Sequence, residues 1–596
     1  MNNKGPRRNM NLNPNEPKVG LKPLIKLVKY SKKYYYLIII SILLSFSASL
    51  INVIIPSILK EITNIIEAGL FSSIDFNDVM KLAFIIIGAA IVGFVFSITQ
   101  GFIMSKVSVS ISEKLRNDLS AKINKLKLNY FDSTSVGNIM SRITNDINLV
   151  NQTLSESIIS FVSSVVSFLG SLIVMFFTNW LLAISGVIAS LIGLVLLMLI
   201  IKTSQKYFIK QQEILGKLNG HIEETYSGQN IVKVYNAENI SIDTFDKMNE
   251  KLYESAWKAQ FMSGLMMPLM GFVGNLGYVV IVILGCYLVI LGQSNFGVIV
   301  AFMMYIRIFT QQLSQLAQIL QSFQNGAAAS HRVFNLLDEE EVTKYDDIVI
   351  TNKTIGNVEF KNIRFGYKKD QTIIKNFSVK VKAGQKIAIV GPTGAGKSTL
   401  INLLMRFYEP NSGTIYIDDV ATNTMSYKEL RDKFCMVLQD TWLFEGTIKE
   451  NIIYSNNDVS DLAIKNVCKA VGIDHFIMSL PNGYDTILND ATTISLGQKQ
   501  LITIARAMID NAPMLILDEA TSSVDTRTEE LIQIAMDNLM MGRTSFVIAH
   551  RLSTIKNADI ILVLKDGDII ESGNHNELMS ENGFYKDLYE SQFKLS

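Results

Sequence analysis

A glycine-rich loop between an apolar strand and a helix carries the most specific chemistry in this sequence. The residues KIAIV at 386–390 predict a buried strand, GPTGAGKST follows at 391–399, and LINLLMRF then predicts a helix. Glycines in such a loop let backbone N–H groups reach phosphate oxygens, and the start of the helix adds its positive end. Lys397 can reach the β- and γ-phosphates, and the Ser398 hydroxyl can ligate Mg²⁺. The residues expected to contact a nucleoside triphosphate here are Gly391, Pro392, Thr393, Gly394, Ala395, Gly396, Lys397, Ser398 and Thr399.

A pair of carboxylates at the end of a second apolar strand fits the same site. The residues MLIL at 514–517 predict a buried strand that runs into Asp518 and Glu519. Strands of open α/β sheets deliver side chains at their C-terminal ends, where ligands bind. Asp518 is suited to the magnesium shell, and Glu519 is suited to orient or deprotonate the attacking water. Together with the phosphate loop, the pair predicts hydrolysis of the bound nucleotide.

The elements that must hold this site occupy only the second part of the chain, because the first part is membrane-like. No charged residue occurs between Lys33 and Lys60, Lys81 and Lys106, Glu156 and Lys202, or Lys258 and Arg307. A span needs roughly 20 apolar residues to cross about 30 Å of hydrocarbon. The first two runs therefore hold one helix each and the last two hold two each, which makes six spans. The net charge of +1 gives no basic field that would favour nucleic acid.

Charge in the loops predicts the orientation of these spans. The segments 105–157 and 202–260 are rich in Lys and Arg and read as long helices that extend beyond the membrane. An excess of positive charge marks the cytoplasmic side, so both termini are expected in the cytoplasm. The predicted organisation is a disordered tail at 1–18, an amphipathic helix on the inner leaflet at 19–33, a six-span domain at 34–325, a linker at 326–355 and an α/β domain at 356–596. A merely basic flank to the first span is the alternative for 19–33.

These motifs together resemble an ATP-binding cassette (ABC) exporter half-transporter, from the amphipathic helix to near the C-terminus. The resemblance implies ATP and Mg²⁺ as cofactors, with a six-helix membrane bundle followed by an α/β P-loop domain of the cassette type. By the family pattern, Tyr367 stacks on adenine, and Gln439 touches Mg²⁺ and senses the membrane domain. Asp525 lies in a loop that communicates across a dimer, and His550 contacts the γ-phosphate. The catalytic set is then Glu519, His550, Lys397 and Gln439, and the metal set is Ser398, Gln439 and Asp518. The segments 131–146 and 223–238 resemble the two intracellular loops whose short helices rest on the cassettes.

The signature motif departs from the family pattern. The family reads L-S-G-G-Q, whereas this chain has Ile494, Ser495, Leu496, Gly497 and Gln498. Ser495, Gly497 and Gln498 can still contact nucleotide, but Leu496 adds a bulky side chain and is expected to remove backbone freedom. In the family, each signature faces the ATP held by the partner chain. The combination therefore resembles one subunit of a heterodimeric bacterial exporter, and a homodimer that tolerates Leu496 at both sites is the alternative.

The predicted function is ATP-driven export of small amphipathic or hydrophobic molecules, drug-like or lipid-like, across the cell membrane by alternating access. An importer with exporter-like architecture, and a membrane ATPase that senses without transporting, both remain as alternatives. Arg307 lies in the sixth predicted span, where a charge should face the cavity or a partner helix. Arg307 could contact the substrate or could pair with a neighbouring helix, and the sequence favours neither role.

Overall fold

The computed structural model describes residues 20, 22–69, 74–342, 354–368, 371–439, 441–454, 456, 458–489, 494–518, 525–549 and 552–593. These residues form two compact units. The helical unit takes the described residues up to Lys125 together with Thr134–Glu339, and the α/β unit takes Leu126–Ser133 together with the described residues from Glu340 onward. The tail predicted at 1–18 lies outside the described residues.

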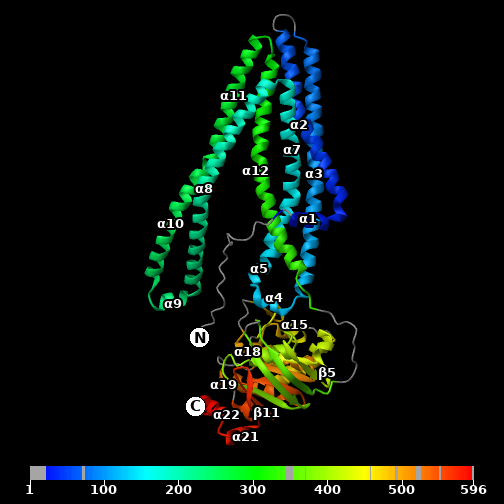
Figure 1. The fold of residues 1–596 in the computed structure, drawn as a ribbon. Helices are drawn as coiled ribbons and strands as arrows, with labels where there is room; N and C mark the ends of the chain where they lie inside the picture. Colours follow the sequence, from blue (N-terminus) through cyan, green and yellow to red (C-terminus); the bar gives the residue numbers. More distant parts are fainter. Residues whose placement is uncertain are drawn as a thin grey trace. The chain divides into compact units, whose positions relative to one another are not determined.

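The helical unit contains six helices that are long and apolar enough to cross a membrane, which confirms the predicted number of spans (Figure 1). The crossing segments are Lys32–Gly69, Phe76–Ile123, Val136–Thr178, Trp180–Ser227, Gly271–Ile290 and Phe296–Asp338. Its elements are α1 (Lys22–Tyr30), η1 (Lys32–Tyr34), α2 (Tyr35–Gly69), α3 (Phe76–Ile123), α5 (Val136–Ser141), η2 (Arg142–Asp146), α6 (Ile147–Gln152), η3 (Thr153–Ser157), α7 (Ile158–Thr178), α8 (Trp180–Ser227), α9 (Gln229–Val234), α10 (Glu238–Gly264), α11 (Met266–Ile290) and α12 (Phe296–Asp338).

Side-chain caps mark where several of these helices begin. Asp75 accepts hydrogen bonds from the backbone N–H groups of Asn77 and Asp78 at the start of α3. Asn179 does the same for Leu182, so a single capping residue separates α7 from α8. Such caps satisfy N–H groups that have no partner within the helix. At the starts of α3 and α8, the caps therefore leave fewer backbone N–H groups without a partner.

The last helix is longer than the sequence predicted. A linker was expected from residue 326, but α12 continues to Asp338. A Cβ added at Gly326 would lie 2.1 Å from the Thr153 hydroxyl oxygen. The backbone of α12 therefore packs directly against the Thr153 side chain of η3. Val333 and Leu336 are fully buried further along the helix. Tertiary packing therefore extends the helix through residues whose composition reads as a linker.

An ion pair fastens the C-terminal end of α12 to η2, the segment between α5 and α6. The Arg332 guanidinium donates to both carboxylate oxygens of Asp146, with Nε 2.9 Å from Oδ2 and Nη2 2.6 Å from Oδ1. The Asp146 side chain is 6% exposed and the Arg332 side chain is 34% exposed. Two parallel bonds fix the relative rotation of the two segments as well as their distance.

In the described residues, the α/β unit holds a six-stranded sheet of order β12-β11-β3-β10-β9-β6, a four-stranded sheet of order β2-β1-β4-β5 and a two-stranded sheet of β7 and β8. Its strands are β1 (Val358–Phe365), β2 (Ile374–Val381), β3 (Lys386–Val390), β4 (Ser412–Ile417), β5 (Val420–Ala421), β6 (Phe434–Val437), β7 (Gly446–Thr447), β8 (Ile487–Leu488), β9 (Met514–Asp518), β10 (Thr544–Ile548), β11 (Ile560–Lys565) and β12 (Asp568–Gly573). Its helices are α4 (Leu128–Ser133), α13 (Lys397–Leu404), η4 (Thr422–Thr424), α14 (Tyr427–Arg431), α15 (Ile448–Ile453), α16 (Asp461–Val471), α17 (Asp474–Ser479), η5 (Gly483–Asp485), α18 (Leu496–Asp510), α19 (Thr526–Met540), α20 (Leu552–Lys556), α21 (His575–Ser580) and α22 (Phe584–Phe593).

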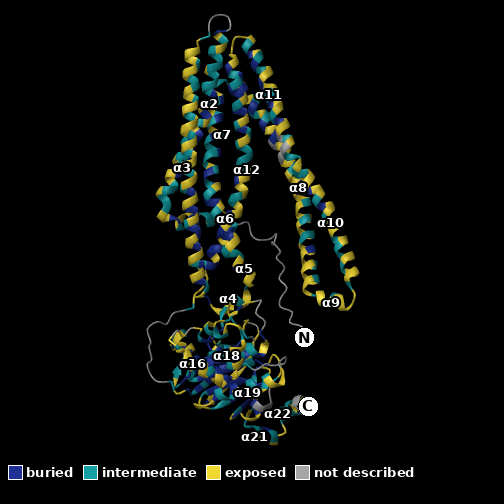
Figure 2. Ribbon diagram, turned by 180° about the vertical axis from the view of Figure 1, so that it is seen from behind, coloured by how far each residue is buried: buried dark blue, intermediate teal, exposed yellow. Residues whose placement is uncertain are grey.

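The central strands of the six-stranded sheet are buried on both faces, which explains why β3 and β9 are apolar along most of their length. Along β3, Ala388 and Val390 join one core cluster, while Ile387 and Ile389 join the other. Successive strand residues point to opposite faces, so a strand with two covered faces must be apolar at every position. Figure 2 shows this buried core inside the α/β unit.

We expect Asp146→Asn to lower the stability of the helical unit much more than a matched surface change. Removing the charge takes away the carboxylate to which two guanidinium nitrogens of Arg332 donate, at a cost of about 3 kcal/mol, the low end for a broken buried pair because Arg332 is partly exposed. The matched control is Asp243→Asn, which breaks an exposed pair with Lys247 one helical turn away and should cost about 0.3–0.5 kcal/mol. Thermal unfolding of the detergent-solubilised protein, followed by tryptophan fluorescence, measures both. Equal midpoints for the two variants would contradict the assignment.

Candidate functional site

Neighbouring parallel strands deliver the predicted site residues to one edge of the sheet. Ile548 of β10 is in register with Ile389 of β3 and with Asp518 of β9, so the ends of these strands are level. The glycine-rich loop follows β3, and Asp518 is the last residue of β9. Gln439 comes two residues after β6, the neighbour of β9. The C-terminal edge of a parallel sheet is where open α/β folds bind ligands.

The glycines of the loop adopt conformations that other residues avoid. Gly391, Gly394 and Gly396 have φ values of 151°, 86° and 104°. A Cβ added at Gly391 would lie 2.2 Å from the backbone oxygen of Leu564 in β11. The loop is therefore pressed against the neighbouring strand, and its backbone can curl only because these positions lack a side chain. Gly396 then forms the N-cap of α13, whose first residue is Lys397.

The Lys397 ammonium group is held over the loop by backbone carbonyls. Its Nζ donates to the carbonyl oxygen of Gly391 at 2.7 Å and to that of Pro392 at 3.1 Å. Burial lowers the pKa of Lys397, and the negative charge of Asp518 acts in the opposite direction. A bound polyphosphate would offer this cation charged oxygens in place of neutral carbonyls, which is a stronger hydrogen bond.

The remaining loop residues divide into an exposed rim and a buried base. Pro392, Thr393, Gly394 and Ser398 are exposed, whereas Ala395, Gly396 and Thr399 are buried. Ser398 thus presents its hydroxyl on the same side as the open part of the loop. The buried residues anchor the loop to the core below it.

The oxygen ligands available at this edge suit magnesium. Ser398 supplies a hydroxyl, Asp518 a carboxylate and Gln439 an amide oxygen, and Ser398 and Gln439 are exposed. Among the described residues, no group of three or more His, Cys, Asp or Glu side chains forms a metal cluster. Mg²⁺ prefers oxygen ligands and commonly takes only one or two from protein, with the rest from phosphates and water. The donor set therefore fits a nucleotide-bound magnesium ion and not a cage made of protein alone.

Tyr367 is an aromatic platform beside the loop. It is 43% exposed, and its ring meets those of Phe365 and Tyr408 edge to face, with centroids 5.0 Å and 4.8 Å away. Its hydroxyl accepts a hydrogen bond from Asn402 Nδ2 at 3.2 Å and lies 3.4 Å from the Thr399 hydroxyl. The Tyr367 ring is thus held in place by two other aromatic rings and by α13, and a fixed, partly exposed ring is suited to stacking on a base.

Tyr408 and Asn402 were missed by the reading of the sequence. Both lie shortly after the loop, in LINLLMRFYEP, where the pattern indicates only an apolar helix and its end. The aromatic pair FY after a helix was the available signal. Their contacts with Tyr367 cross more than 30 positions of the chain, so periodicity could not show them.

The signature residues form the beginning of α18. Ser495 is the N-cap: its hydroxyl accepts from the Gln498 backbone N–H at 3.2 Å, and the Gln498 side-chain oxygen accepts from the Ser495 N–H at 2.8 Å. This reciprocal capping box is a strong helix start. Gly497 is buried. Within the described residues, no hydrogen bond joins these three positions to the glycine-rich loop of the same chain.

The expected loss of backbone freedom at Leu496 is wrong. Leu496 is the first residue of α18 and is not among the residues with positive φ. The first position of a helix takes an ordinary helical conformation, so glycine is not required there. The substitution acts only through its side chain, which is 46% exposed.

Asp525 caps the next helix, and two predicted catalytic residues cannot be placed. The Asp525 carboxylate accepts a hydrogen bond from the Thr528 N–H at 3.0 Å at the start of α19, and this bond lowers the pKa of Asp525. The predicted role of Asp525 in communication across a dimer would be additional to this capping role. Glu519 and His550 lie outside the described residues; in the sequence, Glu519 directly follows β9 and His550 is two residues after the end of β10.

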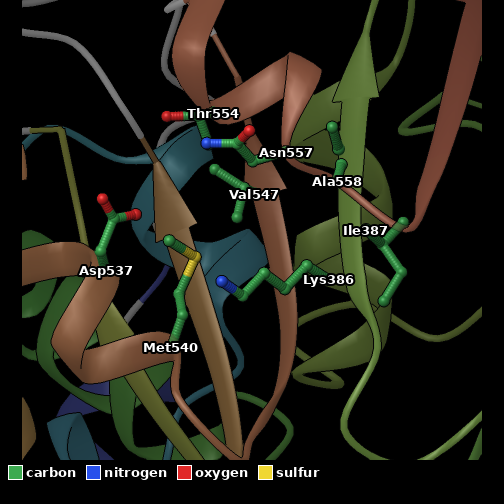
Figure 3. A pocket seen from close by; sticks show the side chains of 9 residues that line it. Lys386, Ile387, Asp537, Met540, Val547, Thr554, Asn557 and Ala558 are labelled. Atoms are coloured by element: carbon green, nitrogen blue, oxygen red, sulfur yellow. The ribbon is translucent and has the colours of Figure 1, made fainter. Parts of the chain in front are cut away.

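A small pocket in the α/β unit is separate from this site. It is lined by Lys386 at the start of β3, by Asp537 of α19 and by Thr554 of α20 (Figure 3). The glycine-rich loop leaves the other end of β3, after Val390. The pocket therefore lies at the N-terminal edge of the strand and takes no part in the phosphate chemistry.

Comparison with known families agrees with this geometry. Residues 38–313 match the ABC transporter transmembrane region, and residues 374–522 match the ABC transporter family. The fatty acid ABC transporter ATP-binding/permease protein of Mycobacterium bovis is 45% identical over 473 residues, which is 79% of this chain and 75% of the relative.

The chain belongs to the ABC transporters. It is a half-transporter, with a membrane region and an ATP-binding region in one polypeptide, and its ATPase is coupled to transport. The ATP-dependent lipid A-core flippase of Syntrophus aciditrophicus is 37% identical over 500 residues, covering 83% of this chain and 82% of that protein. The structure of a bacterial Atm1-family ABC exporter with ATP bound superposes with a TM-score of 0.74 at 26% identity, covering 94% of this chain and 98% of that one. The predicted fold class is therefore confirmed.

We expect Gly391→Ala to abolish nucleotide binding to this ABC half-transporter. The added methyl group would lie 2.2 Å from the Leu564 carbonyl oxygen, so the loop must move away from β11, and this movement misaligns the N–H groups that face phosphate. A loss of about 1.4 kcal/mol already means tenfold weaker binding, and a clash with backbone should exceed it. Fluorescence titration with trinitrophenyl-ATP measures the dissociation constant.

Gly384→Ala is the matched control for this change. Gly384 also has a positive φ, 80°, but a Cβ there would meet nothing within 4 Å. It should lose some stability and keep its affinity for nucleotide. If both alanine variants bind alike, close packing against β11 is not what shapes the loop.

Proposed function

We propose that this chain exports amphipathic, lipid-like or drug-like molecules across the cell membrane, as one half of a dimeric ABC transporter that works by alternating access. The observation that carries the proposal is one chain with six membrane-crossing helices and a complete phosphate loop, related over most of its length to transporters of lipids. The names of those relatives favour the lipid-like class of cargo over other small molecules.

The chemistry assigned to the site is positioning and electrostatics. Lys397 holds the β- and γ-phosphates, and the loop N–H groups hold the remaining phosphate oxygens. Ser398, Asp518 and Gln439 would hold Mg²⁺, which supplies charge neutralisation at the transferred phosphoryl group. Glu519 orients the attacking water, and His550 contacts the γ-phosphate. Tyr367 stacks on adenine.

A dimer is needed to complete this machinery. ABC exporters work as dimers, and the signature at the start of α18 has no link to the chain's own phosphate loop among the described hydrogen bonds. We assign Ser495, Gly497 and Gln498 to the ATP of the partner chain. The helix N-terminus there adds positive charge that favours a γ-phosphate.

The tip formed by α9 supports the same assembly. Ile231 and Val234 of α9 are 66% and 74% exposed, although the helix lies between the polar ends of α8 and α10 and not in a membrane span (Figure 2). Exposed apolar side chains of this kind mark a protein contact. We assign this contact to the cassette of the partner chain.

We further propose that the partner is a different chain with a regular signature. Leu496 stands beside the partner's γ-phosphate, where its side chain excludes close approach of the backbone. The chain's own loop and Glu519 keep the residues needed for hydrolysis. The partner would then carry the weaker catalytic carboxylate, and the two composite sites would differ in rate.

Both termini and the ATP-binding region are assigned to the cytoplasm. The long, basic connections between spans favour that side. An importer of exporter-like architecture would share these motifs, and so would a membrane ATPase that senses without transporting. Direction of transport separates the three.

Transport into inside-out vesicles tests the proposal directly. The complex with its partner is placed in vesicles whose cassettes face the medium, and radiolabelled palmitate is added with ATP. An exporter accumulates the label, an importer releases preloaded label, and a sensor hydrolyses ATP with no movement. Glu519→Gln is the control variant, and in the heterodimer it should nearly abolish both turnover and accumulation. A fall to only about half would contradict the asymmetric assignment.

We expect Leu496→Gly to raise the ATPase turnover of the complex several-fold. The change removes a side chain that meets the partner's phosphate, and it leaves the capping box of Ser495 and Gln498 intact. Leu462→Gly is a matched control, since Leu462 is an exposed leucine in the first turn of α16, another helix capped by a serine. Steady-state phosphate release measures both. If turnover stays constant in both variants, Leu496 does not limit hydrolysis.

We expect Arg307→Gln to weaken transport of anionic cargo. Arg307 lies on the order of 17 Å along α12 from Phe296, about midway through the hydrocarbon. It is exposed within the chain, and no ion pair with it occurs among the described residues. A lost charge-assisted hydrogen bond of about 1.5 kcal/mol would reduce palmitate transport roughly tenfold. Arg307→Lys should retain most of the palmitate transport. The original protein and both variants should transport a fatty alcohol equally well. Equal loss for acid and alcohol would show that Arg307 is structural.

A further inference from the structure

A short segment distant in sequence is part of the α/β unit. Residues Leu126–Ser133 contain α4 and connect α3 with α5, yet they pack with the ATP-binding region. Leu126 forms an isolated β-bridge with Glu341, and Lys127 Nζ lies 2.7 Å from Glu340 Oε2. Both of these contacts involve the stretch of chain that follows α12. A third contact, described next, reaches into the nucleotide site.

The third contact is a hydrogen bond from Tyr408 to Asp132. The Tyr408 hydroxyl donates to the Asp132 carboxylate at the end of α4. Burial, together with this hydrogen bond, raises the pKa of Tyr408, so the phenol keeps its proton and remains a donor. On its other side, the Tyr408 ring packs against the Tyr367 ring at 4.8 Å, with the ring planes 87° apart. One side chain therefore touches both α4 and the platform assigned to adenine.

Tyr408 is held in this place by a rigid stretch of backbone. Arg406, two residues earlier, has φ 52° and is buried. Its Nη1 donates to the carbonyl oxygens of Thr422 at 3.0 Å and Met425 at 2.9 Å. The Phe407 N–H donates to the Asn402 carbonyl at 2.9 Å, which closes the end of α13. Because the backbone on both sides is fixed, a shift of the Tyr367 ring must be taken up by the Tyr408 ring and its hydroxyl.

We infer that Tyr408 is a positioning residue that links occupancy of the base platform to α4. A base stacked on Tyr367 fixes that ring, the edge-to-face contact fixes Tyr408, and the hydrogen bond then fixes Asp132. The segment 126–133 joins two membrane-crossing helices. Binding of the base, and not only of the phosphates, therefore changes the position of a segment that is covalently linked to the helical unit. The inference rests on the proposed role of Tyr367, and it adds to that role a residue that does not touch nucleotide.

Hydrogen exchange with two ligands tests this link. The full complex is incubated with EDTA, to prevent hydrolysis, and with either ATP or inorganic triphosphate at saturation. Both ligands fill the phosphate loop, but only ATP fills the platform. We expect exchange of the peptide covering 126–133 to slow about fivefold with ATP and to stay unchanged with triphosphate. Equal protection by the two ligands overturns the inference.

Variants of the hydrogen bond provide a second readout. Tyr408→Phe and Asp132→Asn should each lower the amount of palmitate moved per ATP hydrolysed about fivefold, with the KM for ATP within twofold of the original. The double variant should be no worse than either single one, because all three lack the same bond. Multiplied losses in the double variant, or a large rise in KM, overturn the inference.

Tyr427→Phe is the matched control. Its hydroxyl lies 3.3 Å from Glu409 Oε1 in the same region, and its ring stacks under Arg406 and not on Tyr367. It should keep normal transport per ATP, and a loss equal to that of Tyr408→Phe would overturn the specific link. Tyr367→Ala separates this inference from the proposed function. If it binds ATP normally, the base platform itself is wrong; if it binds weakly while both ligands protect 126–133 equally, only the link fails.

Discussion

The nucleotide site depends on one constraint, the parallel pairing of β6, β9, β10 and β3 in level register. This pairing brings the ends of four strands to one edge, so that residues from widely separated parts of the chain lie along the edge assigned to the nucleotide. The loop after β3 can use that edge only because Gly391 lies against the Leu564 carbonyl of β11 without a side chain between them. The central strands are covered on both faces, which is why β3 and β9 are apolar along most of their length.

The parts of this architecture that depend on short-range patterns were predictable from sequence. Uncharged runs predicted the six spans, and a glycine loop between strand and helix predicted where Lys397 and Ser398 would lie. Other parts depend on contacts across the chain. Residues 326–338 have no membrane character, yet they continue α12 because Gly326 packs on Thr153. The pairing of Tyr408 with Asp132 spans 276 positions and leaves no periodic signal.

The division into two units has a physical consequence for coupling. The segment 126–133 is covalently part of the connection between spans, but its packing belongs to the ATP-binding region. Three of the contacts described for this segment differ in kind: a backbone bridge, an exposed ion pair and a hydrogen bond to a half-buried phenol. The exposed pair contributes little, because solvent screens it. The bond to Tyr408 is the one that also reaches a residue of the nucleotide site, so it can carry information about that site.

The altered signature is best understood through the helix that it begins. Ser495 and Gln498 satisfy each other's backbone groups, so α18 starts in the same way whether leucine or glycine follows the cap. Leu496 therefore leaves the fold of its own chain unaffected, and its only effect is on whatever approaches the exposed start of the helix. A substitution of this kind can slow one composite ATP site without destabilising either polypeptide. In the proposed heterodimer the two ATP sites are unequal, and a single exposed side chain would be enough to weaken one of them selectively.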